Sequence, residues 1–124
     1  MTVQELLKKT ANEHAAELCE LGDSVSDKSL KKGSAFERVT VPGRNAYAAV
    51  RAATIGAGTV ILDDKEAGQL AALLKGGVGK LAPVLLVAVV ADDEKAELGC
   101  YSKEGLIPQH AAEKTLKEFV AAIS

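Results

Sequence analysis

Aromatic side chains are scarce in this chain. Its 124 residues include no tryptophan, two tyrosines and two phenylalanines, so aromatic residues make up only 3%. Hydrophobic residues nevertheless reach 48%, and leucine, valine, isoleucine and alanine must fill the interior. A chain of this length can bury the core of a single domain. Few aromatic faces are left on which nucleobases or sugars could stack, which argues against single-stranded nucleic acid as a ligand.

Cysteine is almost as rare. Cys19 and Cys100 stand far apart in the sequence, and neither has a second cysteine or a histidine at the spacing of metal ligands. The sequence therefore contains no zinc motif, and it predicts neither a metal nor another cofactor. Free thiols are typical of a reducing intracellular compartment, such as the cytoplasm or the interior of an organelle, and we expect the protein there.

Strong charge and long apolar runs are also missing. The formal net charge is −2 and the isoelectric point is about 5.7, so the field of the whole molecule does not attract nucleic acid or anionic lipid. The longest apolar run, residues 81–91, is too short to cross a bilayer, which takes about 20 residues. Residues 1–21 lack the apolar core of a cleavable signal. We therefore expect neither a membrane nor a nucleic acid as partner.

The pattern of apolar residues predicts an extra helix in front of an α/β domain. Residues 2–21 show helical spacing with one apolar stripe, which could pack on the chain's own domain or in a partner's groove, and we favour its own domain. Residues 22–34 are polar and rich in turn formers, so they predict a linker. The chain is thus divided into an N-terminal helix and linker, 1–34, and an α/β domain, 35–124. The linker contains a small basic cluster that we interpret as a solvated loop: Lys28, Lys31 and Lys32.

The rest of the chain alternates between the patterns of strands and helices. The β-branched run 84–90 predicts a central strand covered on both faces, and the polar turn after it predicts a hairpin. Asp63 and Glu66 fit a capping box, which predicts a helix that continues through Leu74. The predicted elements are strand 36–41, helix 45–55, strand 59–62, helix 63–74, strands 84–90 and 97–101, and a final helix with the apolar stripe Ala112, Leu116, Phe119, Val120 and Ile123. Asn45 is the predicted N-cap of helix 45–55.

The stretch KGGVGK, residues 75–80, is similar to the start of a phosphate-binding loop. Such a loop leaves a strand, enters a helix directly and has Ser or Thr after its lysine. Here the stretch follows a predicted helix, leads into a predicted strand and has Leu81 at the Ser/Thr position. The glycines are therefore interpreted as a helix C-cap and a connection, not as a nucleotide site.

From Phe36 onward the predicted order is β–α–β–α–β–β–α, with Pro83 directly before the third strand. This order resembles the thioredoxin fold over about two-thirds of the chain, best over GTVILDD, KLAPVLLVAVVADDEKAELGCYSKEG and TLKEFVAAIS. The resemblance implies a mixed sheet with a parallel β–α–β unit and a cis bond before Pro83. It also implies that strand 84–90 is antiparallel to strand 59–62.

The resemblance fails at the redox site. Thioredoxin-like oxidoreductases carry cysteine where the first strand meets the first helix, and here that stretch is Val41-Pro42-Gly43-Arg44-Asn45-Ala46. A redox-inactive member of this superfamily is then expected to be no enzyme. It would bind a protein partner, as a subunit of a larger complex. The residues implied in binding are Arg44 and Asn45, which could meet a carboxylate or another anion, and Ala82 with Pro83, where a peptide strand could pair.

Two alternative functions remain open. The final β–α–β–β–α order is similar to the C-terminal domain of alanyl-tRNA synthetases, which implies contact with tRNA or another RNA. The acidic pairs Asp63-Asp64 and Asp92-Asp93 each follow an apolar strand and could hold magnesium for phosphoryl transfer if they met at one edge of the sheet. In a thioredoxin-like sheet they would lie at opposite ends, as a helix cap and a turn.

Overall fold

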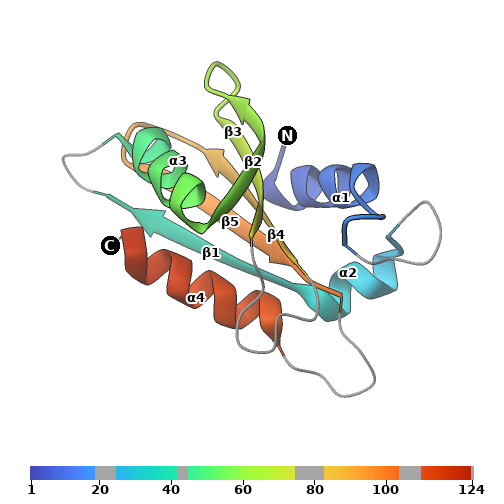
Figure 1. Cartoon of the computed structure of the whole chain (residues 1–124). Coiled ribbons are helices and arrows are strands. Elements are labelled where there is room, and N and C mark those ends of the chain that lie inside the picture. The colour runs from blue at the N-terminus through green and yellow to red at the C-terminus, as the bar shows by residue number, and fades with distance from the viewer. Residues whose placement is uncertain (19–24, 42–44, 75–82, 104–109, 124) are drawn as a thin grey trace.

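The computed structural model describes residues 1–18, 25–41, 45–74, 83–103 and 110–123. These residues form one five-stranded sheet with helices on both faces, so the predicted α/β class is confirmed (Figure 1). No helix in these segments is long and apolar enough to cross a membrane. The elements are α1 (Val3–Glu13), α2 (Asp27–Gly33), β1 (Ser34–Thr40), α3 (Ala46–Ala57), β2 (Gly58–Asp64), β3 (Gln69–Leu74), β4 (Val84–Val90), β5 (Lys95–Tyr101) and α4 (Ala111–Ile123).

The strand order is β1-β5-β4-β3-β2, and every neighbouring pair is antiparallel. Strand β4 is central, as its β-branched run predicts, and its residues Val84–Ala88 are all buried. The predicted hairpin is also confirmed, because β4 pairs with β5. Strands β1 and β2 form the two edges of the sheet.

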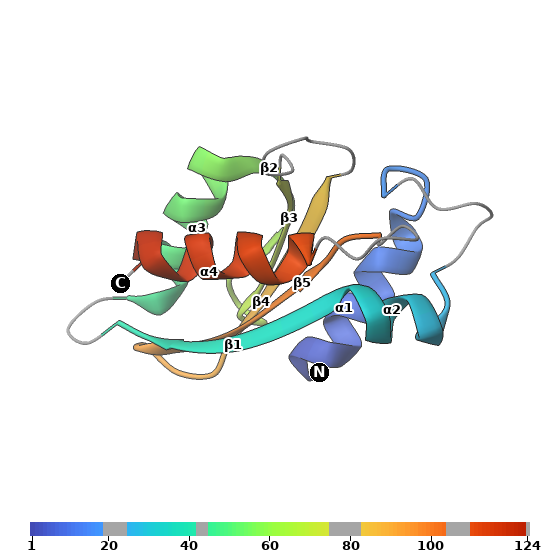
Figure 2. The same cartoon turned by 90° about the horizontal axis from the view of Figure 1, so that it is seen from below.

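Side chains alternate between two apolar cores because successive residues of a strand point to opposite faces. Helices α3 and α4 cover one face, and α1 covers the other over β4 and β5 (Figure 2). The α3 and α4 side buries Leu86 of β4, and the α1 side buries Leu85 and Val87. The final helix buries most of the stripe predicted for it: Ala112, Leu116, Phe119 and Ile123.

The N-terminal helix packs on the chain's own sheet but is shorter than predicted. A capping box between Thr2 and Glu5 starts α1, which ends at Glu13, and a turn follows over 14–18. The Asn12 side-chain amide donates to the Lys8 carbonyl, and its oxygen accepts from the Val25 backbone amide at 2.7 Å. This bond ties the end of α1 to the segment that follows. The apolar spacing nevertheless continues into the turn, where Ala15 and Leu18 are buried.

The predicted linker contains a short helix. Ser26 caps α2 by accepting from the Ser29 amide, and Asp27 lies in its first turn. The basic residues Lys31 and Lys32 occupy the last turn, where positive charge stabilises a helix C-terminus. The basic cluster is therefore part of a helix and not of a solvated loop.

The predicted helix 63–74 is wrong, because this segment forms a β-hairpin between β2 and β3. Asp64, one residue after the predicted cap, accepts from the Ala67 amide at 3.1 Å, but residues 65–68 form a turn and not a helix. Gly68 has a φ of 68°, which glycine adopts readily, and the chain turns there into β3. The alanine and leucine residues of β3 favour helix intrinsically, yet burial between β2 and β4 makes them a strand.

The extra strand changes the topology. Because β3 lies between them and is antiparallel to both, β2 and β4 run in the same direction, so the prediction that strand 84–90 is antiparallel to strand 59–62 is wrong. The observed order from β1 onward is β–α–β–β–β–β–α, and its strands include no parallel neighbours in the described segments. The thioredoxin-like order is therefore not the one observed.

Candidate functional site

Two of the four residues implied in binding, Asn45 and Pro83, lie in the described part of the chain, near opposite ends of β4. Asn45 caps α3 by accepting from the Ala48 amide at 3.0 Å, as predicted, and it shares a hollow with Val90 at the end of β4. Pro83 directly precedes β4 at the opposite end of this strand. Because a strand rises roughly 3.3 Å per residue, the length of β4 separates Pro83 from Asn45 by about 20 Å. Arg44, Ala82, the Ala82–Pro83 bond and the stretch KGGVGK lie outside the described residues.

Asn45 instead lines a cleft beside the first turns of α3. The cleft has a volume of about 420 Å³ and lies between α3 and the end of β2. An adjoining hollow of about 230 Å³ lies against the β2–β3 and β4–β5 turns, and the two share Asn45, Tyr47 and Lys65. We call the larger hollow the α3 cleft; its lining residues are Asn45, Tyr47, Ala48, Arg51, Asp63 and Lys65.

A three-membered network fixes one wall of the α3 cleft. The Tyr47 hydroxyl donates a short hydrogen bond to Asp63 Oδ1, and Arg51 Nε donates to Asp63 Oδ2 at 2.8 Å. Tyr47 and Arg51 are four residues apart and therefore lie on the same face of α3. Helix α3 leads directly into β2 at Gly58, and the two elements run in opposite directions. The end of β2, with Asp63, therefore lies beside the start of α3.

The network sets the protonation of its members. The hydrogen bonds from Tyr47 and Arg51 lower the pKa of Asp63 below its usual range. Burial, together with the bond to Asp63, raises the pKa of Tyr47, and the same carboxylate raises the pKa of Arg51. At neutral pH the cluster therefore contains an ionised carboxylate, a neutral phenol and a guanidinium ion. Such a phenol donates a hydrogen bond and does not serve as a base.

The α3 cleft retains positive charge at its mouth. Arg51 uses its Nε group on Asp63, and the other N–H groups of its planar fork are not engaged by any ion pair within the described segments. Lys65 is exposed on the β2–β3 turn and has no ion-pair partner among the described residues. Tyr47, Arg51 and Lys65 were not predicted from the sequence. The helical spacing of Tyr47 and Arg51, directly before a strand ending in Asp63, is the signal that could identify the network.

The two acidic pairs lie at the same end of the sheet, contrary to the thioredoxin-like expectation. This follows from the common direction of β2 and β4. Their carboxylates are largely engaged, however: Asp63 binds Tyr47 and Arg51, Asp64 caps the β2–β3 turn, and Asp92 accepts from the amides of Glu94 and Lys95. Across the described segments, no group of three or more His, Cys, Asp or Glu residues is placed to hold a metal ion.

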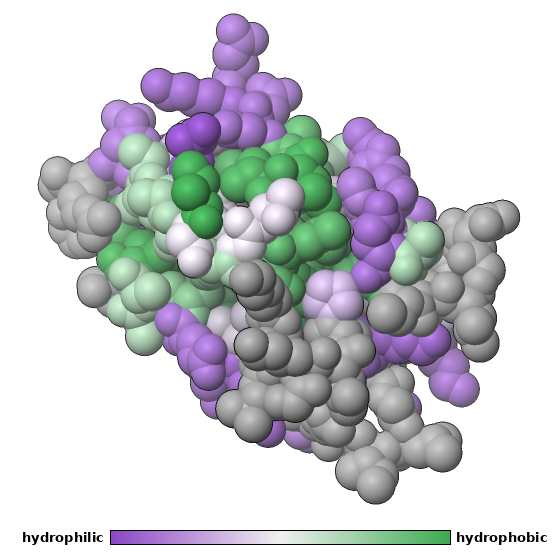
Figure 3. All heavy atoms as spheres, viewed as in Figure 1, coloured by the Kyte–Doolittle hydropathy of each residue, from purple (hydrophilic) through white to green (hydrophobic). Residues whose placement is uncertain are grey.

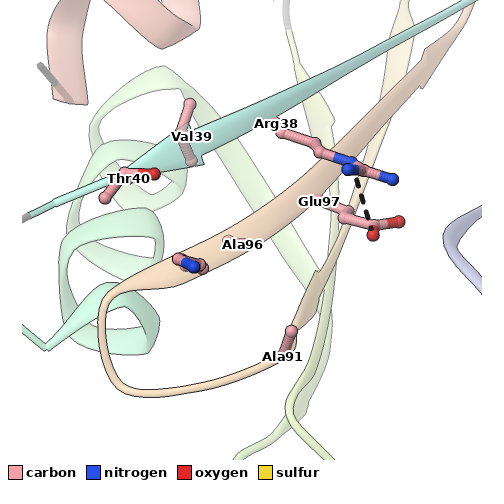
Figure 4. A pocket seen from close by; sticks show the side chains of 7 residues that line it. Arg38, Val39, Thr40, Ala91, Ala96 and Glu97 are labelled. Atoms are coloured by element: carbon pink, nitrogen blue, oxygen red, sulfur yellow. Dashed lines mark ion pairs between the residues drawn. The ribbon is translucent and has the colours of Figure 1, made fainter.

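A separate groove lies where β1 and β5 extend beyond α1 (Figure 4). It has a volume of about 340 Å³. Arg38 and Glu97 point to the same side of the sheet there and form an ion pair at 3.7 Å (Figure 4). The Arg38 side chain is 86% exposed, against 48% for Arg51, so Arg38 is held much less firmly. We therefore regard the α3 cleft as the better defined of the two.

Among the described residues, neither surface contains a reactive thiol. Cys100 lies on β5 inside the core, where burial raises its pKa to about 12. The thiolate, which is the reactive form of cysteine, is therefore scarce at neutral pH. Cys19 lies outside the described residues.

Comparisons with protein-family models, curated proteins and solved structures found no match to this chain. The arrangement of its own residues is therefore the basis for a functional proposal.

Proposed function

We propose that this chain binds another protein, as a non-catalytic subunit of an assembly. The observation that supports this proposal is the edge strand β2. It closes one side of the sheet, and its middle residues, Thr59–Leu62, have no charged side chain. An uncharged edge strand presents unpaired backbone groups to which an extended segment of a partner can add.

The two edges of the sheet differ in this respect. Strand β1 has the exposed charged residues Glu37 and Arg38 in its middle, and charge of this kind prevents strand addition. Strand β2 is charged only at its end, at Asp63 and Asp64. Strand addition is therefore expected at β2 and not at β1.

An apolar area surrounds the β2 edge. Figure 3 shows it over α3 and the β2–β3 hairpin, bounded by hydrophilic atoms of the β2–β3 turn and of α1. Ile55, at the end of α3, is 53% exposed, and the neighbouring apolar side chains of β2 and β3 are half-buried. We call the apolar residues on both sides of this edge the β2 surface: Ile55 and Val60 lie on the α3 side of the sheet, and Ile61, Leu62 and Leu73 lie on the α1 side.

The shape of β2 limits how a partner can pair. The register with β3 shifts between Val60 and Leu62, and such a bulge twists the strand. A partner strand would therefore pair on one side of the bulge only, and much of the affinity would come from apolar contact with the β2 surface. The expected partner segment is short, extended and largely apolar. This surface differs from the Ala82 contact that the thioredoxin-like resemblance implies.

The proposal is tested by placing a lysine on each edge in turn. Thr59 of β2 and Thr40 of β1 are both exposed, so Thr59→Lys and Thr40→Lys make the same chemical change at the two edges. The chain and both variants are used to recover partners from the native source under reducing conditions. We expect the wild type and Thr40→Lys to recover one or more partner proteins in similar amounts. Thr59→Lys should recover at least tenfold less of the same proteins.

Other outcomes contradict the proposal. Equal recovery by both variants excludes β2 as the contact. Recovery of RNA that is lost on ribonuclease treatment, with no protein dependent on Thr59, supports the RNA-contacting alternative instead. Thermal unfolding of both variants shows whether the fold is retained.

A further inference from the structure

We propose that the α3 cleft binds a carboxylate group of a ligand, held between Arg51 and Lys65. This site is separate from the β2 surface, and the inference does not depend on strand addition there. It concerns side chains of α3, of the β2–β3 turn and of Asp63 at the end of β2, which together line a hollow of about 420 Å³ and include no residue of the β2 surface.

Arg51 is arranged to recognise a planar anion. Asp63 accepts from its Nε group at 2.8 Å, and Tyr47 donates to the other oxygen of the same carboxylate. The guanidinium ion is thus fixed before any ligand arrives, and the terminal N–H groups remain for a second carboxylate. A planar fork of this kind matches carboxylate geometry, and little side-chain entropy is lost when its position is already set.

The other walls of the cleft suit a ligand with a small apolar body. Lys65 provides a second positive charge, and Asn45 lies at the start of α3. Ala48 and the ring of Tyr47 form the apolar part of the lining. A carboxylate between Arg51 and Lys65 would therefore leave its attached carbon atoms against Ala48 and Tyr47.

The local charge favours a carboxylate over a phosphate. Arg51 and Lys65 contribute two positive charges to the cleft and Asp63 one negative charge, so a single negative charge balances the site. The adjoining hollow is lined by Glu66, Asp92 and Asp93, which repel a group with greater negative charge. A phosphate monoester has a charge of about −1.5 to −2 at neutral pH and is therefore disfavoured.

The test is a titration with acetate and with inorganic phosphate, followed by NMR. The Nε–H resonance of Arg51 is recorded in the full-length chain while acetate replaces chloride at constant ionic strength. We expect a saturable shift with acetate and at least tenfold weaker binding of phosphate. The backbone amide of Ala48 should follow the same acetate curve.

Three variants assign the effect to the cleft. Measured at the Ala48 amide, which every variant retains, Arg51→Gln and Lys65→Gln should each weaken acetate binding about tenfold, which corresponds to the loss of one charged hydrogen bond. Arg38→Gln removes the arginine of the β1–β5 groove and should leave the binding curve unchanged. Lys65 lies on an exposed turn, so Lys65→Gln provides the result if Arg51→Gln impairs folding.

A shift of the Ala48 amide that rises linearly without saturation, or that is the same in Arg51→Gln and Lys65→Gln as in the wild type, would overturn the inference. So would phosphate binding as tight as acetate binding. Because none of these variants changes the β2 surface, recovery of a protein partner can succeed or fail independently of the titration.

Discussion

At the scale of single residues, the account depends on how Tyr47, Asp63 and Arg51 hold one another. Tyr47 and Arg51 were not predicted as site residues, and Asp63 was considered only as a helix cap or as part of a magnesium site, whereas Asn45 was correctly predicted to cap its helix. A helix cap such as Asn45 involves only four consecutive residues, so it can be recognised from the local sequence. The network joins α3 to the far end of β2, so it becomes visible only when the connection between them is known.

The network predicts a defined dependence of stability on pH. The pKa of Asp63 is lower in the folded state than in the unfolded chain, where it is near 4. The contribution of Asp63 to the free energy of unfolding is therefore complete above about pH 4, and it is lost as the pH falls through the folded-state pKa. The pKa of Tyr47 is raised, so its contribution is complete below the unfolded pKa near 10 and is lost as pH rises through the raised value.

Tyr47→Phe tests the alkaline side of this dependence. The variant lacks the hydroxyl that donates to Asp63, and we expect its free energy of unfolding to fall by up to about 1 kcal/mol at neutral pH, because one side of the network faces solvent. Urea titrations of both proteins from pH 7 to pH 11 should show this difference shrinking above pH 10. A difference that stays constant to pH 11 would contradict the assigned role of the hydroxyl.

At the scale of elements, most of the sheet and its covering helices could be predicted, and one hairpin could not. Strands β4 and β5 follow from a β-branched run and a polar turn, α3 follows from its Asn45 cap, and α4 follows from its apolar stripe. The segment 69–74 contains alanine and leucine, which favour helix locally, and only its place between β2 and β4 makes it a strand. The end of α1 was overestimated because apolar spacing continues through the buried turn after it.

The junction between α3 and β2 provides a prediction at this scale. A Cβ atom at Gly58 would lie 2.2 Å from the Leu73 carbonyl oxygen, whereas one at Gly56, in the last turn of α3, would meet nothing within 4 Å. We expect Gly58→Ala to lower the free energy of unfolding by about 1–3 kcal/mol, since backbone must move. Gly56→Ala should raise it by up to about 1 kcal/mol, because alanine favours helix.

Urea denaturation of the two glycine variants beside the wild type measures both effects. The pair is matched, since each adds one methyl group within three residues of the other. Equal effects of the two substitutions would mean that the close approach of β2 to β3 at Gly58 is not as the structure has it.

At the scale of the whole molecule, the two faces of the sheet are unequally covered. Helices α3 and α4 lie on one face, while α1 covers the other over β4 and β5 and leaves part of β2 and β3 beside it half-buried. The composition anticipates an interior of small aliphatic residues but contains no information on which edge stays uncovered. Which strand forms the edge depends on the strand order, and this order follows from β3, the strand that replaces a predicted helix.

The central claim, that a partner protein adds to the β2 edge, is tested most directly by hydrogen exchange followed by mass spectrometry. The chain is measured alone and with the protein that Thr59→Lys fails to recover. We expect the amides of Gly58–Asp64 to exchange at least tenfold more slowly in the complex, while those of β1, Ser34–Thr40, are unchanged. Unchanged exchange across Gly58–Asp64, or slower exchange at β1 instead, would contradict the claim.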